Sequence, residues 1–230
     1  MDMGFYMGVP RRVLKLGGSV LTCKSVPYCL DVAVTRQCLS ELRDFSQGLV
    51  LVHGGGSFGH YEASKRAPTR IQLTAVSMQE LNAYIMREIS VLGIRAFPIP
   101  GRYFNMEHLE RVIELGYMPV IYGDVRENGE IVSGDDLTIA IAKKYSLTAL
   151  FATDVDGVIV NGKVVYELDR LEDFVGLEHD SYDVTGGMAE KLRKIFTANV
   201  NSLVFNGKRK GNIFNALKGE RIGTLIKVRE

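Results

Sequence analysis

Residues 49–60 read LVLVHGGGSFGH, a stretch that joins an apolar strand to a run of glycines. Glycine lacks a Cβ and tolerates positive φ, so three in succession let backbone N–H groups converge on an anion. A helix beginning near Ser57 would add free N–H groups and its positive dipole end, and His60 would add a charge-assisted bond. The expected ligand is a phosphate group. The alternative is a glycine-rich turn beside a solvated histidine, because a lone glycine triplet is not specific.

The composition places the function in a local site. The chain has 230 residues, 46% of them hydrophobic, which suffices for one large core or two closely packed lobes. Lys and Arg number 28 and Asp and Glu 27, a formal net charge of +1. This balance excludes the charge footprint of nucleic-acid and membrane-surface proteins. No apolar run is long enough for a signal peptide or a membrane span.

The cysteines indicate a reducing compartment. Cys23, Cys29 and Cys38 form neither a CxxC pair nor a Cys/His zinc pattern. Their odd number argues against a disulfide framework. The sequence therefore predicts a cytoplasmic protein with no metal-ligating cluster.

Short apolar runs alternate with longer helical patterns along the chain. This alternation is typical of an α/β fold, an open and mainly parallel sheet with helices on both faces. Strands are expected at 13–16, 49–52, 94–99, 118–122, 148–153, 202–205 and 223–228, and helices at 31–46, 74–92, 105–115, 135–145 and 186–199. We expect a soft boundary near residue 146, with an N-terminal lobe over 1–145 and a C-terminal lobe over 146–230 on one continuous sheet.

Two segments interrupt this alternation as predicted hairpins. VRENGEIV at 125–132 and VIVNGKVV at 158–165 each place Asn-Gly between β-formers, the strongest local hairpin signal. The second overlaps GVIVNGKV, which has the spacing of a P-loop through Lys163. Val164 stands where a Ser or Thr hydroxyl must reach Mg²⁺, so a hairpin is the better interpretation. The match of GGGSFG at 54–59 to the dinucleotide motif G-x-G-x-x-G is a lone match and equally weak.

A second glycine turn follows the first strand. KLGGSV covers Lys15 to Val20, so a strand lysine is followed by Gly17, Gly18 and Ser19. Two strand-to-glycine turns in one sheet suggest two anionic groups that face each other. Lys24 follows nine residues after Lys15, near enough to share this space. For either lysine alone an exposed surface charge is the alternative, more so for Lys24.

Acidic residues and a third glycine pair occur later in the chain. SGDD at 133–136 opens a helix, where Asp135 or Asp136 need be no more than an N-cap. ATDVDGV at 152–158 ends a buried strand in two acids, at the edge of an open sheet where ligands bind. DVTGGMAEK at 183–191 places Gly-Gly at a helix start with Lys191 one turn in, which suits phosphate.

Taken in order, these motifs resemble the signature set of the amino acid kinase superfamily over most of residues 11–228. The ending HGGGSFGH is most similar to archaeal-type isopentenyl phosphate kinases, because His60 matches the histidine with which that family binds the acceptor's phosphate. The resemblance implies a three-layer αβα sandwich, an acceptor lobe followed by an ATP lobe, and a homodimer. The segments between His60 and Ala75 and between Phe97 and Met106 look shorter than is usual in the family, which puts the apolar end of the substrate in doubt.

The resemblance also implies roles for individual residues. The catalytic residues would be Lys15, Lys24, Asp135, Lys191 and His60, with Asp135 positioning two phosphate-binding lysines and Lys24 stabilising the transition state. ATP would be held by Lys15, Gly17, Gly18, Ser19, Gly56, Asp154, Gly187 and Lys191. The acceptor phosphate would be held by Gly55, His60 and Gly134.

The expected activity is the Mg²⁺-dependent transfer of the γ-phosphoryl group of ATP to isopentenyl phosphate. Apolar positions along 74–92 favour an isoprenoid tail weakly. One alternative is a related kinase for another phosphate or phosphonate acceptor, such as a fosfomycin-type kinase. The other is a non-catalytic relative that binds nucleotides or anions, against which Lys15, Lys24, Asp135 and Lys191 argue together.

Overall fold

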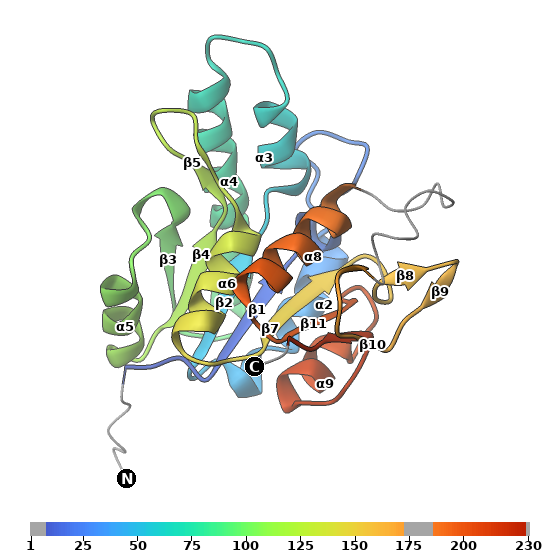
Figure 1. Ribbon diagram of the computed structural model, residues 1–230. Helices are drawn as coiled ribbons and strands as arrows, with labels where there is room; N and C mark the ends of the chain where they lie inside the picture. The colour runs from blue at the N-terminus through green and yellow to red at the C-terminus, as the bar shows by residue number, and fades with distance from the viewer. Residues whose placement is uncertain (1–7, 173–185, 229–230) are drawn as a thin grey trace, which may run out of the picture.

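A mainly parallel sheet forms the centre of the computed structural model, which describes residues 8–172 and 186–228 (Figure 1). The strand order is β10-β12-β11-β7-β1-β2-β4-β3, and β12 and β10 run antiparallel to the rest. All seven predicted strands are present. The strands of this sheet are β1 (Arg12–Leu16), β2 (Leu49–His53), β3 (Ala96–Pro100), β4 (Met118–Tyr122), β7 (Ala149–Thr153), β10 (Glu167–Leu168), β11 (Ser202–Asn206) and β12 (Thr224–Ile226).

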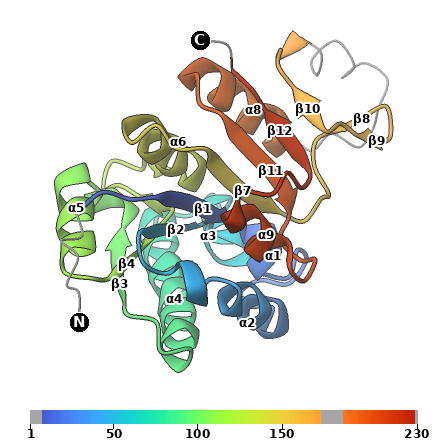
Figure 2. The ribbon, with the colours of Figure 1, turned by 90° about the horizontal axis from the view of Figure 1, so that it is seen from below.

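Helices cover both faces of this sheet, as Figure 2 shows from below. One face carries α5, α6 and α8, and the other carries α1, α2, α4 and α9 (Figure 2). The helices are α1 (Gly18–Leu21), α2 (Val32–Ser40), α3 (Gly56–Ala63), α4 (Arg70–Val91), α5 (Met106–Glu114), α6 (Gly134–Lys144), α8 (Gly186–Ala198) and α9 (Asn212–Lys218), with 3-10 turns at Arg43–Phe45 and Gly101–Tyr103. The expected three-layer αβα sandwich is therefore confirmed.

The core follows from strand alternation. Val13 packs in the cluster on the α5–α6–α8 side, whereas the adjacent Leu14 packs in the opposite cluster. Strands buried on both faces read as continuous apolar runs, which is why LVLV was recognisable. The periodic residues of α4, among them Leu81 and Ile85, are buried, so that stripe belongs to the core.

Both predicted hairpins form. β5 (Asp124–Val125) pairs with β6 (Ile131–Val132), and β8 (Ile159–Val160) pairs with β9 (Lys163–Val164). At the tip of the second hairpin Asn161 has φ 49° and Gly162 has φ 72°, the left-handed pair that a two-residue turn requires. The P-loop-like segment is thus a hairpin.

The expectation of unpaired cysteines is wrong for two of them. Cys23 and Cys29 form a disulfide, with their Cα atoms 5.4 Å apart. Thr22 and Leu30 form an antiparallel bridge that folds the chain back and brings the two cysteines together. Cys38 is a buried free thiol, and burial raises its pKa to about 12. An odd number of cysteines is thus compatible with one local disulfide and one buried free thiol.

Within the described residues no helix has the length and apolar content needed to cross a membrane. The two parallel neighbours β1 and β2 pair from Arg12 with Leu49 to Leu16 with His53, so they end side by side. The turns that leave them therefore start at the same edge of the sheet, where the candidate site lies.

Candidate functional site

A cavity of about 980 Å³ lies at the carboxyl ends of β1, β2 and β7, where ligands bind in open α/β sheets. Most of the predicted site residues line it. They are Lys15, Gly17, Gly18, Ser19, Lys24, Gly56, His60, Asp135, Asp154, Gly187 and Lys191.

Two predicted residues lie behind the lining. A Cβ at Gly55 would meet Met78 Sδ of α4 at 3.0 Å, so Gly55 faces that helix. A Cβ at Gly134 would lie 3.2 Å from Lys15 Cε and 3.3 Å from the His53 carbonyl oxygen. Gly134 therefore leaves room for the Lys15 side chain. The first residues of DVTGGMAEK, 183–185, lie outside the described residues.

The two glycine turns touch through their backbones. A Cβ at Gly18 would lie 2.1 Å from Gly56 N, and one at Gly54 would lie 2.9 Å from Gly18 N. Gly56 has φ +47°, and a Cβ there would also strike Thr22 Oγ1. Side chains are therefore excluded where the turns meet, and bare backbone from both turns lines the cavity.

Two lysines converge on one carboxylate oxygen. Lys15 Nζ of β1 lies 2.6 Å from Asp135 Oδ1, and Lys191 Nζ of α8 binds the same oxygen. Only 11% of the Lys15 side chain and 9% of the Lys191 side chain are exposed. The backbone N–H of Asp135 donates to Ser133 Oγ at 3.2 Å, so Ser133 is the N-cap of α6. The Asp135 side chain is thus available to hold the two ammonium groups.

The charges in this cluster shift one another. Burial opposes ionisation of Asp135, but the positive charges of Lys15 and Lys191 outweigh it and hold the pKa of that carboxyl well below its usual range. Burial is also the largest influence on Lys191, and the charge of Lys15 adds to it. Together they lower the pKa of Lys191 to about 8, against the opposing effect of Asp135. With both lysines protonated and Asp135 ionised, the three side chains carry a net charge of about +1.

Lys24 lies at the mouth of the cavity. Its Nζ is 2.5 Å from Asp154 Oδ2, and 66% of its side chain is exposed against 17% for Asp154. Burial opposes ionisation of Asp154, whereas hydrogen bonds from Lys24 and Ser19 stabilise the carboxylate and lower its pKa. The second acid of ATDVDGV, Asp156, accepts instead from Asn206 Nδ2 at 2.9 Å, away from the lysine cluster.

The two histidines of HGGGSFGH differ. His53 is fully buried, with Nε2 3.3 Å from the Asn82 amide and its ring stacked on Tyr122 at 5.5 Å. Burial lowers the pKa of His53 to about 4, so it is neutral and structural. His60 is exposed and lines the cavity. Desolvation is the largest influence on His60, and together with the charge of Lys15 it lowers the pKa of this histidine, against the opposing effect of Asp135.

Sequence reasoning missed several lining residues. Lys194 Nζ of α8 lies 3.0 Å from Asp136 Oδ1, and the loop residues Val26 and Pro27 also line the cavity. The signal for Lys194 was its place one helical turn after Lys191. Among residues 8–172 and 186–228 no group of three or more His, Cys, Asp or Glu side chains is arranged to hold a metal ion.

Known proteins share this architecture and sequence. Residues 10–206 match the model of the amino acid kinase family. The chain is 32% identical to isopentenyl phosphate kinase of Methanocaldococcus jannaschii, over 93% of this chain and 97% of that protein. It is 30% identical to isopentenyl phosphate kinase of Thermoplasma acidophilum, over 94% of this chain and 99% of that protein. A solved isopentenyl phosphate kinase superposes with a TM-score of 0.80 at 25% identity, over 94% of this chain and 99% of that one. With its sheet order, its glycine turns and this match, the chain belongs to the amino acid kinase family.

Proposed function

We propose that this protein transfers the γ-phosphoryl group of ATP to the phosphate of isopentenyl phosphate, forming isopentenyl diphosphate for isoprenoid biosynthesis. One observation carries the proposal: Lys15 and Lys191 converge on Asp135 beside two touching glycine turns, in a cavity that also holds His60. The similarity to isopentenyl phosphate kinases over nearly the whole chain supports the choice of acceptor.

The reaction needs charge neutralisation more than proton transfer. The acceptor is already an anion, so its phosphate oxygen attacks Pγ without a general base. The new O–Pγ bond forms as the bond from Pγ to the β,γ-bridging oxygen breaks, and ADP leaves. The main barrier is to bring two negatively charged phosphates together, which positioning and positive charge overcome.

The cavity contains groups for both tasks. We assign the ATP phosphates to Lys15, Gly17, Gly18 and Ser19, and the rest of the nucleotide site to Gly56, Asp154, Gly187 and Lys191. We assign the acceptor phosphate to His60, with Gly55 and Gly134 shaping the backbone around it. Asp135 acts as a positioning residue, because its carboxylate is shared by two lysines and its lowered pKa keeps it charged.

Lys24 is proposed to stabilise the transition state. Its exposed side chain extends over the cavity mouth to Asp154, so it can turn toward a phosphoryl group in transit. As in other phosphoryl-transfer sites, a cation held where negative charge develops favours the transition state over the ground state.

Mg²⁺ fits this site as a companion of ATP. Asp135 and Asp154 are both paired with lysines, and the described residues hold no acidic cluster for a dedicated cation. Phosphate oxygens, waters and one carboxylate are the ligands that Mg²⁺ takes in such sites, and Asp154 is the carboxylate we assign. The ion would neutralise phosphate charge.

The wider setting is also part of the proposal. We place the acceptor in residues 1–145 and the nucleotide in residues 146–230, apart from Lys15, the glycine turn at Gly17 and Gly56, which also serve ATP. We further propose a homodimer in the cytoplasm, whose small-molecule partner is isopentenyl phosphate.

A coupled ADP-release assay tests the proposal. Mg·ATP is supplied with isopentenyl phosphate and, in parallel, with dimethylallyl phosphate, fosfomycin, UMP and N-acetylglutamate. Turnover confined to the isoprenoid phosphates is the expected result. Turnover of fosfomycin alone would indicate a kinase for a phosphonate acceptor. ATP binding without turnover on any acceptor would indicate a non-catalytic relative.

A further inference from the structure

The loop that carries Lys24 is closed at its base by a disulfide. Cys23 and Cys29 are bonded, and the backbone N–H of Cys23 donates to the Cys29 carbonyl oxygen at 2.9 Å. Between them, Lys24, Ser25, Val26 and Pro27 all line the cavity. These residues are exposed, so the loop has no core of its own and depends on its base for its position.

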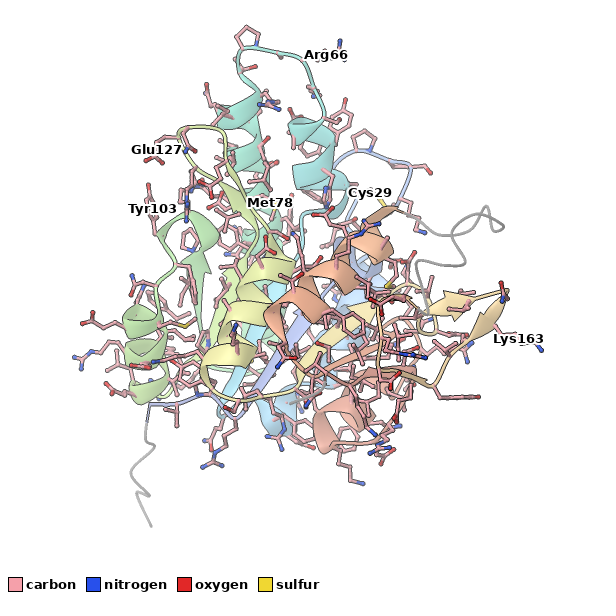
Figure 3. The ribbon with its side chains drawn as sticks, in the orientation of Figure 1. Cys29, Arg66, Met78, Tyr103, Glu127 and Lys163 are labelled. Carbon is pink, nitrogen blue, oxygen red and sulfur yellow. A yellow bond between two sulfur atoms is a disulfide. The ribbon has the colours of Figure 1, made fainter. Side chains whose placement is uncertain are left out.

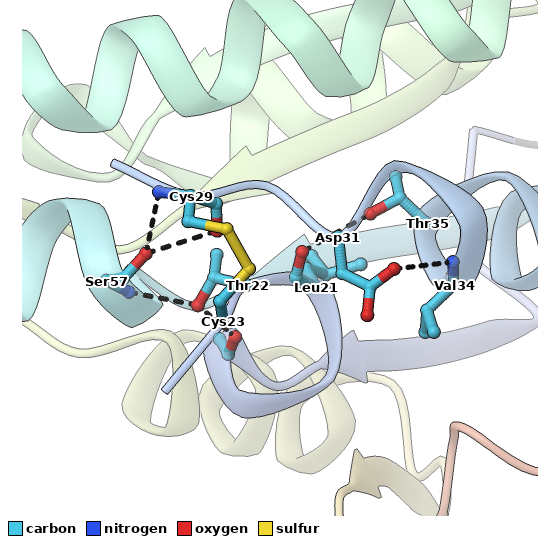
Figure 4. Close-up of a disulfide and its surroundings, with 9 residues drawn as sticks. Leu21, Thr22, Cys23, Cys29, Asp31, Val34, Thr35 and Ser57 are labelled. Atoms are coloured by element: carbon cyan, nitrogen blue, oxygen red, sulfur yellow. Dashed lines mark hydrogen bonds between the residues drawn. A yellow bond between two sulfur atoms is a disulfide. The ribbon is translucent and has the colours of Figure 1, made fainter. Parts of the chain in front are cut away.

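The Cys29 side of the loop is anchored to α3. The backbone N–H of Cys29 donates to Ser57 Oγ at 3.2 Å, and Ser57 Oγ donates to the Cys29 carbonyl oxygen at 3.2 Å (Figure 4). The N–H of Tyr28 donates to the Ser57 carbonyl oxygen at 3.1 Å, and the Tyr28 hydroxyl donates to the buried Glu62. Cys29 is therefore fixed relative to the helix that carries His60.

The Cys23 side, which leads directly into Lys24, has backbone ties in the Cys23 N–H bond to the Cys29 carbonyl oxygen and the bridge from Thr22 to Leu30. Its neighbour Thr22 accepts from the N–H of Ser57 at 2.9 Å, but beyond Thr22 the chain rises into the exposed loop. The lysine of the Lys24–Asp154 ion pair is mostly exposed, and an ion pair to an exposed lysine holds its long side chain poorly. The disulfide links Cys23, the residue before Lys24, covalently to Cys29, which is fixed on α3.

We propose that Cys23 and Cys29 are positioning residues for Lys24, and that their oxidation state sets the rate of phosphoryl transfer. This inference rests on the role of Lys24 in the proposed function. A small dithiol reaches the partly exposed pair and breaks the S–S bond. Two S–H bonds form, and the dithiol loses two electrons and two protons as it closes to its own disulfide. The freed loop then presents Lys24 over a wider range of positions.

The kinetic test compares oxidised protein with protein reduced by dithiothreitol, using Mg·ATP and isopentenyl phosphate. Reduction is expected to lower kcat by about 10- to 100-fold, as for small misplacements of a catalytic group, with both KM values little changed. The double variant Cys23→Ser/Cys29→Ser is expected to have the kcat of the reduced protein, and dithiothreitol should not change that kcat. Cys38→Ser, which removes the buried thiol, is expected to respond as the unaltered protein does.

Lys24→Met separates positioning from general stabilisation. In this variant kcat is expected to be low and equal in the oxidised and reduced states, because the disulfide has no lysine left to position. If reduction lowered kcat of Lys24→Met by the same factor, the disulfide would act through stability alone and the inference would fall. Equal kcat for oxidised and reduced unaltered protein, with reduction confirmed by thiol titration, would also overturn it.

Lysine labelling distinguishes failure of this inference from failure of the proposed function. If neither state turns over isopentenyl phosphate, the proposed function fails, and the acylation rate of Lys24 is then measured by peptide mapping. Reduction is expected to raise that rate and to leave the acylation rate of Lys163, the first residue of β9, unchanged (Figure 3). Equal labelling of Lys24 in both states, or three titratable thiols in unfolded protein after treatment with an oxidant, would contradict the inference.

Discussion

Lys15 Nζ lies 2.6 Å from Asp135 Oδ1, although 120 residues separate the two in the chain. The contact joins the end of β1 to the first turn of α6, where the helix dipole also favours a carboxylate. Lys191 of α8 completes the cluster on the same oxygen. One carboxylate thereby orders two cations from different elements beside the glycine turns.

Asp135→Asn is expected to lower both activity and stability. Without the carboxylate, Lys15 and Lys191 are buried near each other with no counter-charge, and removing one partner of such a pair costs about 3–5 kcal/mol. Loss of lysine positioning is expected to lower kcat by roughly 10²–10³. Urea unfolding and steady-state kinetics measure the two effects. Asp136→Asn, at the exposed neighbour that pairs with Lys194, is the control and should change both only slightly.

The rate constant kcat/KM for ATP is expected to fall as the pH rises through about 8. The pKa of Lys191 is lowered to about 8, and a lysine carries its charge only below its pKa, so the free enzyme loses a phosphate-binding cation above that pH. Bound phosphates favour the ammonium form, so the fall in kcat should occur at higher pH than the fall in kcat/KM. In Lys191→Arg the guanidinium stays charged, so the fall in kcat/KM near pH 8 should disappear. If kcat/KM of this variant still fell near pH 8, the fall would be due to another titrating group.

His60→Ala is expected to raise the KM for isopentenyl phosphate and leave the KM for ATP near its original value. His60 lines the cavity, and a bound phosphate dianion would raise its pKa and so gain a charge-assisted bond. Steady-state kinetics with each substrate varied in turn provide the measurement. His108→Ala on α5 is the matched control, since His108 packs beside Phe97 and does not line the cavity. An unchanged acceptor KM in His60→Ala would remove His60 from the acceptor site.

Lys24→Ala is expected to lower kcat by about 10²–10³, or about 2.7–4 kcal/mol, with little change in Tm. The side chain is mostly exposed, so its removal costs the fold little, whereas the transition state loses a cation. Lys163→Ala serves as a control because it removes an equal charge from the β8–β9 hairpin (Figure 3), at a residue that does not line the cavity. Equal kcat for both variants would make Lys24 a surface charge.

Two glycine substitutions should separate fold from ligand binding. Gly18→Ala places a Cβ 2.1 Å from Gly56 N, so the glycine turns must move apart, and both stability and ATP use should fall. A Cβ at Gly187 meets nothing within 4 Å, so Gly187→Ala should keep the fold and slightly stabilise α8. Because Gly187 lines the cavity, the methyl group should raise the KM for ATP. Thermal unfolding and ATP kinetics of the two variants test the contrast.

Local patterns were enough to predict most of the fold. Apolar runs such as LVLV, the periodic stripe of α4 and the two Asn-Gly hairpins depend on neighbouring residues alone, and the structure confirms each. The short helices α1 and α9 were not predicted, because a few residues carry too little periodicity to show. The disulfide was missed because it depends on the fold-back that the Thr22–Leu30 bridge creates.

By itself the sequence determined the strands, the longer helices, the glycine turns and the family motifs. Each of these features depends on residues that are adjacent or one helical turn apart in the chain. Only the tertiary structure decided which groups meet: that Ser133, and not Asp135, caps α6, and that Lys15 and Lys191 share one oxygen. It also decided that His53 is buried and neutral while His60 lines the cavity. The physical reason is that burial, pKa and ion pairing depend on which distant segments pack together, and no local pattern specifies that packing.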